Sequence, residues 1–377
     1  MKTEKTSVNI VGMIGTQRET VSNARATVSV FGGGINPGSE LPRGIDPDYI
    51  LEFARAHEDS DFDMVLTGYS SSTPDGFEVT SYAAGHTKRI GFLIAHRPGF
   101  IMPTLAARKI ATLDQLTQGR IALHIISGGS DKEQRSDGDW INHDARYRRT
   151  DEYMGLLRRI WREREPFDHE GEFYRFEDVY SQVRCFQDPN VPLFFGGASD
   201  IALEVGSKRA DVFALWGEPL SAIKERITDI TNRALSHNRK IKFSLSVRPI
   251  IGVTESEAWA RAESILQQVQ QATLGKIDPG QPARLQSEGS RRLLRFAEQR
   301  DVHDDRLWMP IASASGAAGS TTCLVGTAEQ VADSLMKYFD LGCDTFIIRG
   351  FDPLQDAKEY GKDLIPLIRR KASNRMC

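Results

Sequence analysis

Residues 90–127 read IGFLIAHRPGFIMPTLAARKIATLDQLTQGRIALHIIS and hold one full unit of the pattern that decides the fold. Two short runs rich in branched and aromatic residues, 90–96 and 120–127, predict buried strands. Between them, 102–119 has the apolar spacing of a helix and ends at Gly119, which suits a left-handed C-terminal cap. Strand, helix and strand in this order predict parallel strands joined by a right-handed crossover.

The same alternation extends along the chain. A Thr cap at Thr327 opens one of the intervening helical patterns, although Glu329 falls one residue short of capping-box spacing. No G-x-G-x-x-G turn follows the first strand run, as an open dinucleotide-binding sheet would normally require. The pattern therefore predicts an α/β (β/α)₈ TIM barrel, with an open doubly wound sheet as the alternative. Eight runs have strand character: 9–14, 64–68, 90–96, 120–127, 193–197, 212–217, 243–253 and 345–350.

Composition narrows the class of protein. The chain has 377 residues, of which 40% are hydrophobic and 26% charged, enough for a sizeable core. Its net charge of −3 gives no electrostatic reason to bind nucleic acid or an anionic membrane. No apolar run is long enough to span a bilayer, the start lacks a secretory pattern, and four widely spaced cysteines suit a reducing compartment. We expect a cytoplasmic enzyme forming one domain over 1–377.

Two segments are longer than a minimal barrel needs. Residues 15–46 follow the first strand and are rich in Gly, Ser and Pro, and 274–312 follow the helix after the seventh strand. Long loops in a compact domain often serve as lids or binding loops. The sequence predicts a loop insertion at 15–46 and a mobile lid at 274–312, with insertions of no role as the alternative.

A phosphate site is predicted where the fifth strand meets a helix, at Gly196-Gly197-Ala198-Ser199-Asp200. Glycines let backbone N–H groups approach an anion, and a helix N-terminus adds unpaired donors. Ser199 would add a hydroxyl. An ordinary turn and helix cap would use the same residues, but phosphate sites recur in the late loops of this barrel.

Other strand ends and helix starts carry candidate polar and aromatic residues. His143 and Tyr147 are four residues apart, so they share one face of a helix and could grip a polar cofactor; a plain capped helix is the alternative. Trp216 could wall a pocket or close the barrel as core. Three arginines would lie on one rim, and they would either converge on an anion or pair separately with carboxylates: Arg97, Arg248 and Arg349.

Several catalytic motifs are absent. There is no H-x-H, H-E-x-x-H, G-x-S-x-G or P-loop motif, and none of the eight histidines pairs at metal-ligand spacing. We therefore expect no metal site and no nucleophile triad. A bound organic cofactor becomes the expected source of chemistry.

Six stretches, in this order along 44–370, resemble the bacterial luciferase-like flavin-dependent monooxygenases. Within that family the chain is most similar to the alkanesulfonate monooxygenase branch, with dimethyl sulfone monooxygenases nearby. The stretches are PTLAARKIATLDQLTQGRIALHIISG (103–128), HDARYRRTDEYMGLLRRIW (143–161), GEFYRF (171–176), PLFFGGASD (192–200), WGEP (216–219) and LIPLIRR (364–370).

The resemblance implies a TIM barrel that takes reduced FMN (FMNH₂) from a separate NAD(P)H-dependent FMN reductase. It also implies use of O₂ to oxygenate a small substrate, and in the sulfonate branch cleavage of the C–S bond to an aldehyde and sulfite. It implies a homodimer or homotetramer, a lid at 274–312, and Trp216 beside the substrate. Residues expected at the flavin are Ser127, His143, Tyr147, Gly197, Ala198 and Ser199, with the last three on its phosphate.

The substrate residues of the sulfonate branch are largely replaced. The chain has no cysteine in 68–73 after the second strand and no histidine in 15–17 after the first. Where the branch has an Arg and a His on strand seven, Ser246 and Arg248 stand, and Phe351 and Pro353 replace a Tyr and a His on strand eight. The run 313–322 lacks the expected arginine. A rebuilt anion site is expected from Arg97, Arg248, Arg349 and Phe351, with Trp216, Arg248 and Arg349 as catalytic candidates.

The expected function is an FMNH₂-dependent monooxygenase of a small organosulfur compound. The alternatives are the same oxygenation of another small polar substrate, a deazaflavin-dependent oxidoreductase, and a flavin-binding protein without catalysis on the same barrel.

Overall fold

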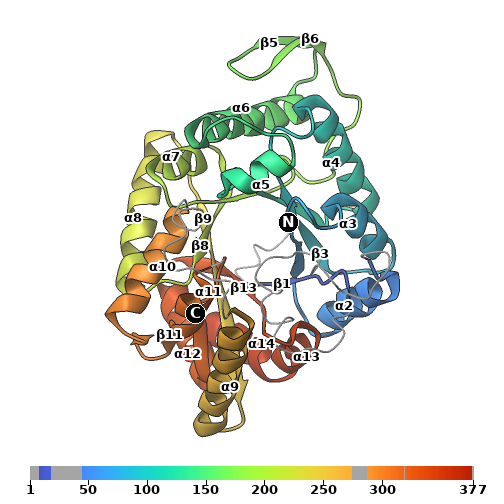
Figure 1. The fold of residues 1–377 in the computed structure, drawn as a ribbon. Coiled ribbons are helices and arrows are strands. Elements are labelled where there is room, and N and C mark those ends of the chain that lie inside the picture. The colour runs from blue at the N-terminus through green and yellow to red at the C-terminus, as the bar shows by residue number, and fades with distance from the viewer. Residues whose placement is uncertain (1–7, 18–44, 274–286, 318, 376–377) are drawn as a thin grey trace.

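The computed structural model describes residues 8–17, 45–273, 287–317 and 319–375, and these form a closed barrel of eight parallel strands (Figure 1). Each strand pairs with the next, and the last returns to the first, which confirms the predicted TIM barrel. All eight predicted strand runs are strands. In ring order they are β1 (Asn9–Met13), β2 (Met64–Thr67), β3 (Gly91–His96), β4 (Ile121–Ile125), β7 (Leu193–Gly196), β8 (Val212–Trp216), β9 (Lys242–Gly252) and β13 (Cys343–Ile348).

Helices surround the barrel (Figure 1). A short helix, α5 (Asp131–Ser136), precedes α6 after strand four, and a π-helical segment, Tyr360–Leu364, joins α13 to α14. Apart from two helices of the insertion, which are described below, the other helices are α2 (Pro47–Asp59), α3 (Gly76–Gly85), α4 (Pro103–Thr117), α6 (His143–Arg162), α7 (Asp200–Arg209), α8 (Leu220–Ser236), α9 (Glu255–Thr273), α12 (Ala328–Asp340), α13 (Pro353–Glu359) and α14 (Ile365–Arg375).

Local sequence explains where these helices begin and end. In α4 the left-handed cap is Gln118, with φ of 54°, and Gly119 continues in the same region. At the start of α12, Gln330 and not Glu329 completes a capping box with Thr327. The Thr327 side chain accepts from the Gln330 N–H, and the Gln330 side chain accepts from the Thr327 N–H, so the box is complete at the correct spacing.

Strand β9 belongs to two sheets at once. Its first part pairs with β8 and β13 in the barrel, and its second part pairs in parallel with β12 (Cys323–Thr327). Two short antiparallel strands, β11 (Leu307–Trp308) and β10 (Val302–His303), extend this side sheet. The insertion is therefore built onto strand seven itself.

The expected long loop at 274–312 is largely ordered structure where it is described. Residues 287–312 hold α10 (Glu288–Gln299), β10, β11 and the start of α11 (Pro310–Ser315), because Ser287 caps α10 and apolar residues recur at helical spacing within it. Residues 274–286 lie outside the described residues. So do 18–44, which make up most of the insertion predicted at 15–46.

Along each barrel strand, successive side chains belong alternately to two apolar clusters. Ile10, Phe92 and Phe213 belong to the main core between strands and helices. The intervening side chains form a separate cluster in the barrel interior, the apolar plug: Val11, Leu93, Ala122, Phe194, Val212 and Ile347, with Met64 and Leu66 against it. This alternation fixes which side chains farther along each strand face the lumen.

A two-stranded hairpin, β5 (Phe167–Glu170) and β6 (Arg175–Val179), projects beyond α6 (Figure 1). It contains the GEFYRF stretch, and the carboxylate of Glu152 on α6 holds its turn by accepting the N–H groups of Phe173 and Tyr174. None of the helices in the described residues combines the length and apolar character needed to cross a bilayer.

Two buried histidines in the helix-facing core should make the protein acid-sensitive. Burial lowers the pKa of His57 and of His96 from 6.5 to about 4. As the pH falls below 6.5, the unfolded chain binds protons that the folded state refuses, so folding stability falls until about pH 4. We expect His57→Phe to reduce the stability lost between pH 6.5 and 5 by about 1 to 2 kcal/mol. Urea unfolding at both pH values measures this; equal losses in the two proteins would contradict it.

Candidate functional site

The loop from β7 to α7 has the features of an anion cradle. Ser199 is the N-cap of α7, yet its side chain makes no capping hydrogen bond, and its buried Oγ is hydrogen-bonded to none of the residues that the structure describes. Gly197 must be glycine here, since a Cβ would stand 2.5 Å from the Cβ of Ala202 and 3.2 Å from the hydroxyl of Tyr147. The free hydroxyl and the close backbone approach are what a phosphate group requires.

One face of α6 borders this loop. The rings of His143 and Tyr147 lie 4.9 Å apart, and Tyr147 packs edge-on against Phe195 of β7. Burial raises the pKa of the Tyr147 phenol. His143 is partly exposed, and its Nδ1 lies 2.8 Å from the Asp144 carboxylate. The phenol therefore stays protonated near neutral pH as a hydrogen-bond donor.

Ser127, after β4, joins the same face of α6. Its Oγ lies 2.9 Å from the Oγ1 of Thr150, which is on α6 one turn beyond Tyr147. The buried amide of Gln134 on α5 donates to the carbonyl of Ser127 at 2.9 Å. The structure thus brings Ser127, Tyr147 and Ser199 to one side of the barrel mouth.

A cation beside the cradle was missed by sequence reasoning. Arg226 on α8 donates to the carbonyl of Ala198 at 3.2 Å. Burial, and then the positive charge of Arg292, lowers its pKa. An arginine on a helix is usually a solvated residue, so only the contact with the loop reveals it. Its charge favours an anion at the cradle.

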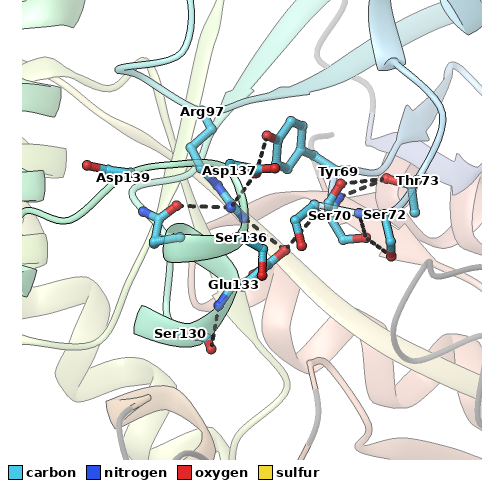
Figure 2. A network of polar contacts seen from close by, with 12 residues as sticks. Tyr69, Ser70, Ser72, Thr73, Arg97, Ser130, Glu133, Ser136, Asp137 and Asp139 are labelled. Atoms are coloured by element: carbon cyan, nitrogen blue, oxygen red, sulfur yellow. Dashed lines mark hydrogen bonds and ion pairs between the residues drawn. The ribbon is translucent and has the colours of Figure 1, made fainter.

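Arg97 lies in a polar network at the ends of strands two to four (Figure 2). Its guanidinium donates to Gln134 at 3.0 Å, and it lies 3.2 Å from Glu133 and 3.7 Å from Asp137. The ring of Tyr69 stacks below it at 4.4 Å, and the Tyr69 hydroxyl donates to Asp137. Arg97 is therefore neutralised by carboxylates, and through Gln134 it supports Ser127.

Arg248 and Arg349 lie together, Arg248 at the point where β9 leaves the barrel for the side sheet and Arg349 just after the end of β13. Arg248 is fully buried, donates to the carbonyls of Ser320 and Gly350, and lies over the ring of Phe351 at 4.9 Å. Burial lowers its pKa to about 10. Burial, and then the charge of Arg248, lowers the pKa of Arg349 well below its ordinary value. Two adjacent guanidiniums of this kind favour a bound anion.

Arg349 differs from the other two arginines in its partners. Its guanidinium contacts the thioether of Met13, and within the described ranges it forms no ion pair with a carboxylate. Of the three arginines expected on one rim, the structure brings Arg248 and Arg349 together and gives Arg97 a separate set of acidic partners.

Trp216, at the end of β8, lies beneath the insertion. A Cβ on Gly289 of α10 would stand 2.8 Å from its indole ring, so helix and indole are in close contact. Arg292 on α10 donates through Nε to the carboxylate of Glu218 at 2.8 Å and through a second nitrogen to its other oxygen. This ion pair is mostly buried, with 19% and 9% of the two side chains exposed, and it fixes α10 over Trp216.

Metal-binding clusters are not found among the residues that the structure describes: no three His, Cys, Asp or Glu side chains gather in the required way.

The chain is similar in sequence and fold to known proteins. A family profile described as luciferase-like monooxygenase matches residues 27–345. Among solved structures, riboflavin lyase (RcaE), solved with modified FMN and riboflavin, is 20% identical over 97% of this chain and 92% of its own, with a TM-score of 0.76. DmoA from Hyphomicrobium sulfonivorans is 21% identical over 97% and 88%, with a TM-score of 0.74. EDTA monooxygenase (EmoA) from Chelativorans sp. is 17% identical over 97% and 94%, with a TM-score of 0.73.

Proposed function

The chain belongs to the luciferase-like monooxygenase family, and from that premise we propose that it is an FMNH₂-dependent monooxygenase of a small anionic organosulfur compound. A separate NAD(P)H-dependent reductase would supply the reduced FMN. The observation that carries the proposal is the buried, unpartnered Ser199 hydroxyl in a glycine cradle beside Tyr147.

The hydrogen-bond donors of this site suit FMN. The orphaned Ser199 hydroxyl and the N–H groups at the start of α7 suit its phosphate, and Arg226 adds positive charge. Ser127, His143 and Tyr147 would hold the rest of the cofactor, since all three lie around the same face of α6. Gly197 and Ala198 would contribute backbone only. When bound, reduced FMN supplies two electrons to O₂, so that one oxygen atom enters the substrate and the other leaves as water.

The protein itself would exclude water and orient the substrate. Trp216 and the overlying α10 form an apolar cover held by the buried Arg292–Glu218 pair, which suits chemistry that bulk water would quench. Arg349, free of carboxylate partners among the described residues, would bind the anionic head of the substrate next to Arg248. Such a head is a sulfonate in our proposal, and the products are an aldehyde and sulfite.

Turnover with defined cofactors tests this proposal. The protein is titrated anaerobically with reduced FMN and then exposed to O₂ with a panel of sulfonates, sulfones and carboxylated analogues. We expect tight binding of reduced FMN and release of sulfite that requires both O₂ and one member of the panel. Sulfite assay and product mass are the readouts.

The same panel separates the alternatives. Turnover with a reduced deazaflavin but not with reduced FMN would replace the proposal with a dehydrogenase. An oxygenated product without sulfite would keep the oxygenation and overturn C–S cleavage. Flavin binding with no O₂-dependent product from any panel member would leave a flavin-binding protein without this catalysis.

A further inference from the structure

Two polar residues point into the barrel interior from opposite walls, His124 on β4 and Arg349 after β13. On β4, Leu123 and Ile125 pack in the core toward the helices, so His124 between them points into the lumen. The same alternation turns Arg349 inward after Ile348 on β13. The two strands are four positions apart in both directions round the ring, so they lie on opposite sides of the barrel.

His124 is flanked by Ala95 on β3 and by Phe194 on β7, and smaller side chains follow above it. Its ladder partner on β3 is Ala95, and on the next two strands Gly196 pairs with Ala214. His124 stands two residues above Ala122 of the apolar plug, so it forms part of the lumen floor. Solvent reaches the lumen at this depth. Four lumen-facing residues are partly exposed, whereas the adjacent residues that face the helices are buried: His124, Gly196, Ala214 and Arg349.

The imidazole ring of His124 lacks hydrogen-bond partners among the described residues. Its Nδ1 is buried without a partner, and neither ring nitrogen is hydrogen-bonded to another described residue. Burial lowers its pKa from 6.5 to about 4, so near neutral pH the ring keeps one donor and one acceptor nitrogen. A buried polar group left in this state is costly unless something else satisfies it. The other histidine on a barrel strand, His96, is paired with the Tyr153 hydroxyl at 2.7 Å.

We propose that His124 and Arg349 form the two ends of a binding site for a short organic anion. The anionic head would bind Arg349 near the barrel mouth, and a hydroxyl or similar hydrogen-bonding group at the other end would reach His124 on the floor. Ala95 beside His124, and Gly196 and Ala214 one layer above it, add little side-chain volume between the two ends. The inference rests on the proposed function only in taking this anion to be the substrate.

Two isosteric probes test the role of His124. 2-Hydroxyethanesulfonate and propane-1-sulfonate have the same charge and nearly the same shape, and they differ by a hydroxyl against a methyl group. Calorimetry with the full chain should show the wild type binding the hydroxylated probe about five- to tenfold more tightly, the worth of one good hydrogen bond. His124→Leu should lose this preference, and His124→Asn, whose amide can still donate, should recover part of it.

Two further variants complete the design. Arg349→Gln should weaken both probes about tenfold or more while leaving the preference between them, because it removes only the head-group contact. His86→Leu, on the exposed end of α3, is the matched control and should behave as the wild type. The pair 3-hydroxypropanoate and butanoate repeats the comparison with a carboxylate head.

Specific results would overturn the site. Failure of the wild type to bind any of the four probes, equal affinity within both pairs, or an unchanged preference in His124→Leu would each do so. All measurements are made with and without oxidised FMN and need no turnover. Retained probe preference without any oxygenation would therefore reject the proposed function alone, whereas oxygenation without His124-dependent preference would reject this site alone.

Discussion

Ser199→Asp is expected to weaken the binding of reduced FMN by about 100-fold or more. The substitution places a carboxylate in the cradle that we assign to the phosphate, where the native Oγ is buried and unpartnered. Two like charges about 4 Å apart repel by about 4 kcal/mol at the effective dielectric of a protein surface, and a tenfold loss needs only about 1.4 kcal/mol. Anaerobic titration followed by flavin fluorescence measures the change.

Two controls sharpen that test. Ser199→Ala removes one hydrogen bond without adding charge, so it should cost about 1 kcal/mol, or roughly fivefold in affinity. Ser373→Asp adds the same charge on the exposed end of α14 and should leave binding unchanged. Native affinity in Ser199→Asp would show that the phosphate lies elsewhere.

Arg292→Met should destabilise the protein by about 3 kcal/mol, because it leaves the buried Glu218 carboxylate without its ionic partner. The loss should appear first as faster amide exchange in α10, the helix that the pair fixes over Trp216. Urea unfolding and hydrogen exchange measure the two effects. Combining it with Glu218→Gln should recover part of the stability, since no charge is then left buried.

Arg295 offers a matched control on the same helix. It pairs with Glu288, but 61% of its side chain is exposed, so Arg295→Met should change stability by less than about 1 kcal/mol. Equal losses in the two variants would mean that burial of the Glu218 pair is not what holds α10.

The barrel was predictable because its signals are local. Each strand is a compact apolar run, such as 90–96, and each helix begins or ends at a residue with a clear capping role, such as Thr327. The loop at 196–200 could be picked out as a candidate phosphate site for the same reason, since its glycines, serine and following helix are contiguous in sequence. The capping box of α12 is equally local, since Gln330 stands three residues after Thr327.

The site residues that depend on distant partners could not be sorted from sequence. Arg97 and Arg349 both stand just after a barrel strand, so the sequence does not distinguish them. Only the fold shows that Glu133 and Asp137 neutralise Arg97, whereas Arg349 contacts Met13. His124 was hidden because it interrupts an apolar strand run, where a histidine is ordinarily a core residue with a satisfied ring. Only the folded barrel shows that no described residue lies within hydrogen-bonding distance of the Nδ1 of His124.

Because β9 pairs in both the barrel and the side sheet, the insertion cannot be deleted without exposing part of that strand. Joining Gly252 directly to Thr327 would give a shorter chain with all eight barrel strands, but it would strip the side sheet from Pro249–Gly252. That stretch would become an open edge of unpaired backbone groups next to buried Ile250 and Ile251, a template for self-association. A trimmed enzyme of this design should therefore aggregate, and a usable one would need a charged or proline-bearing replacement at that edge.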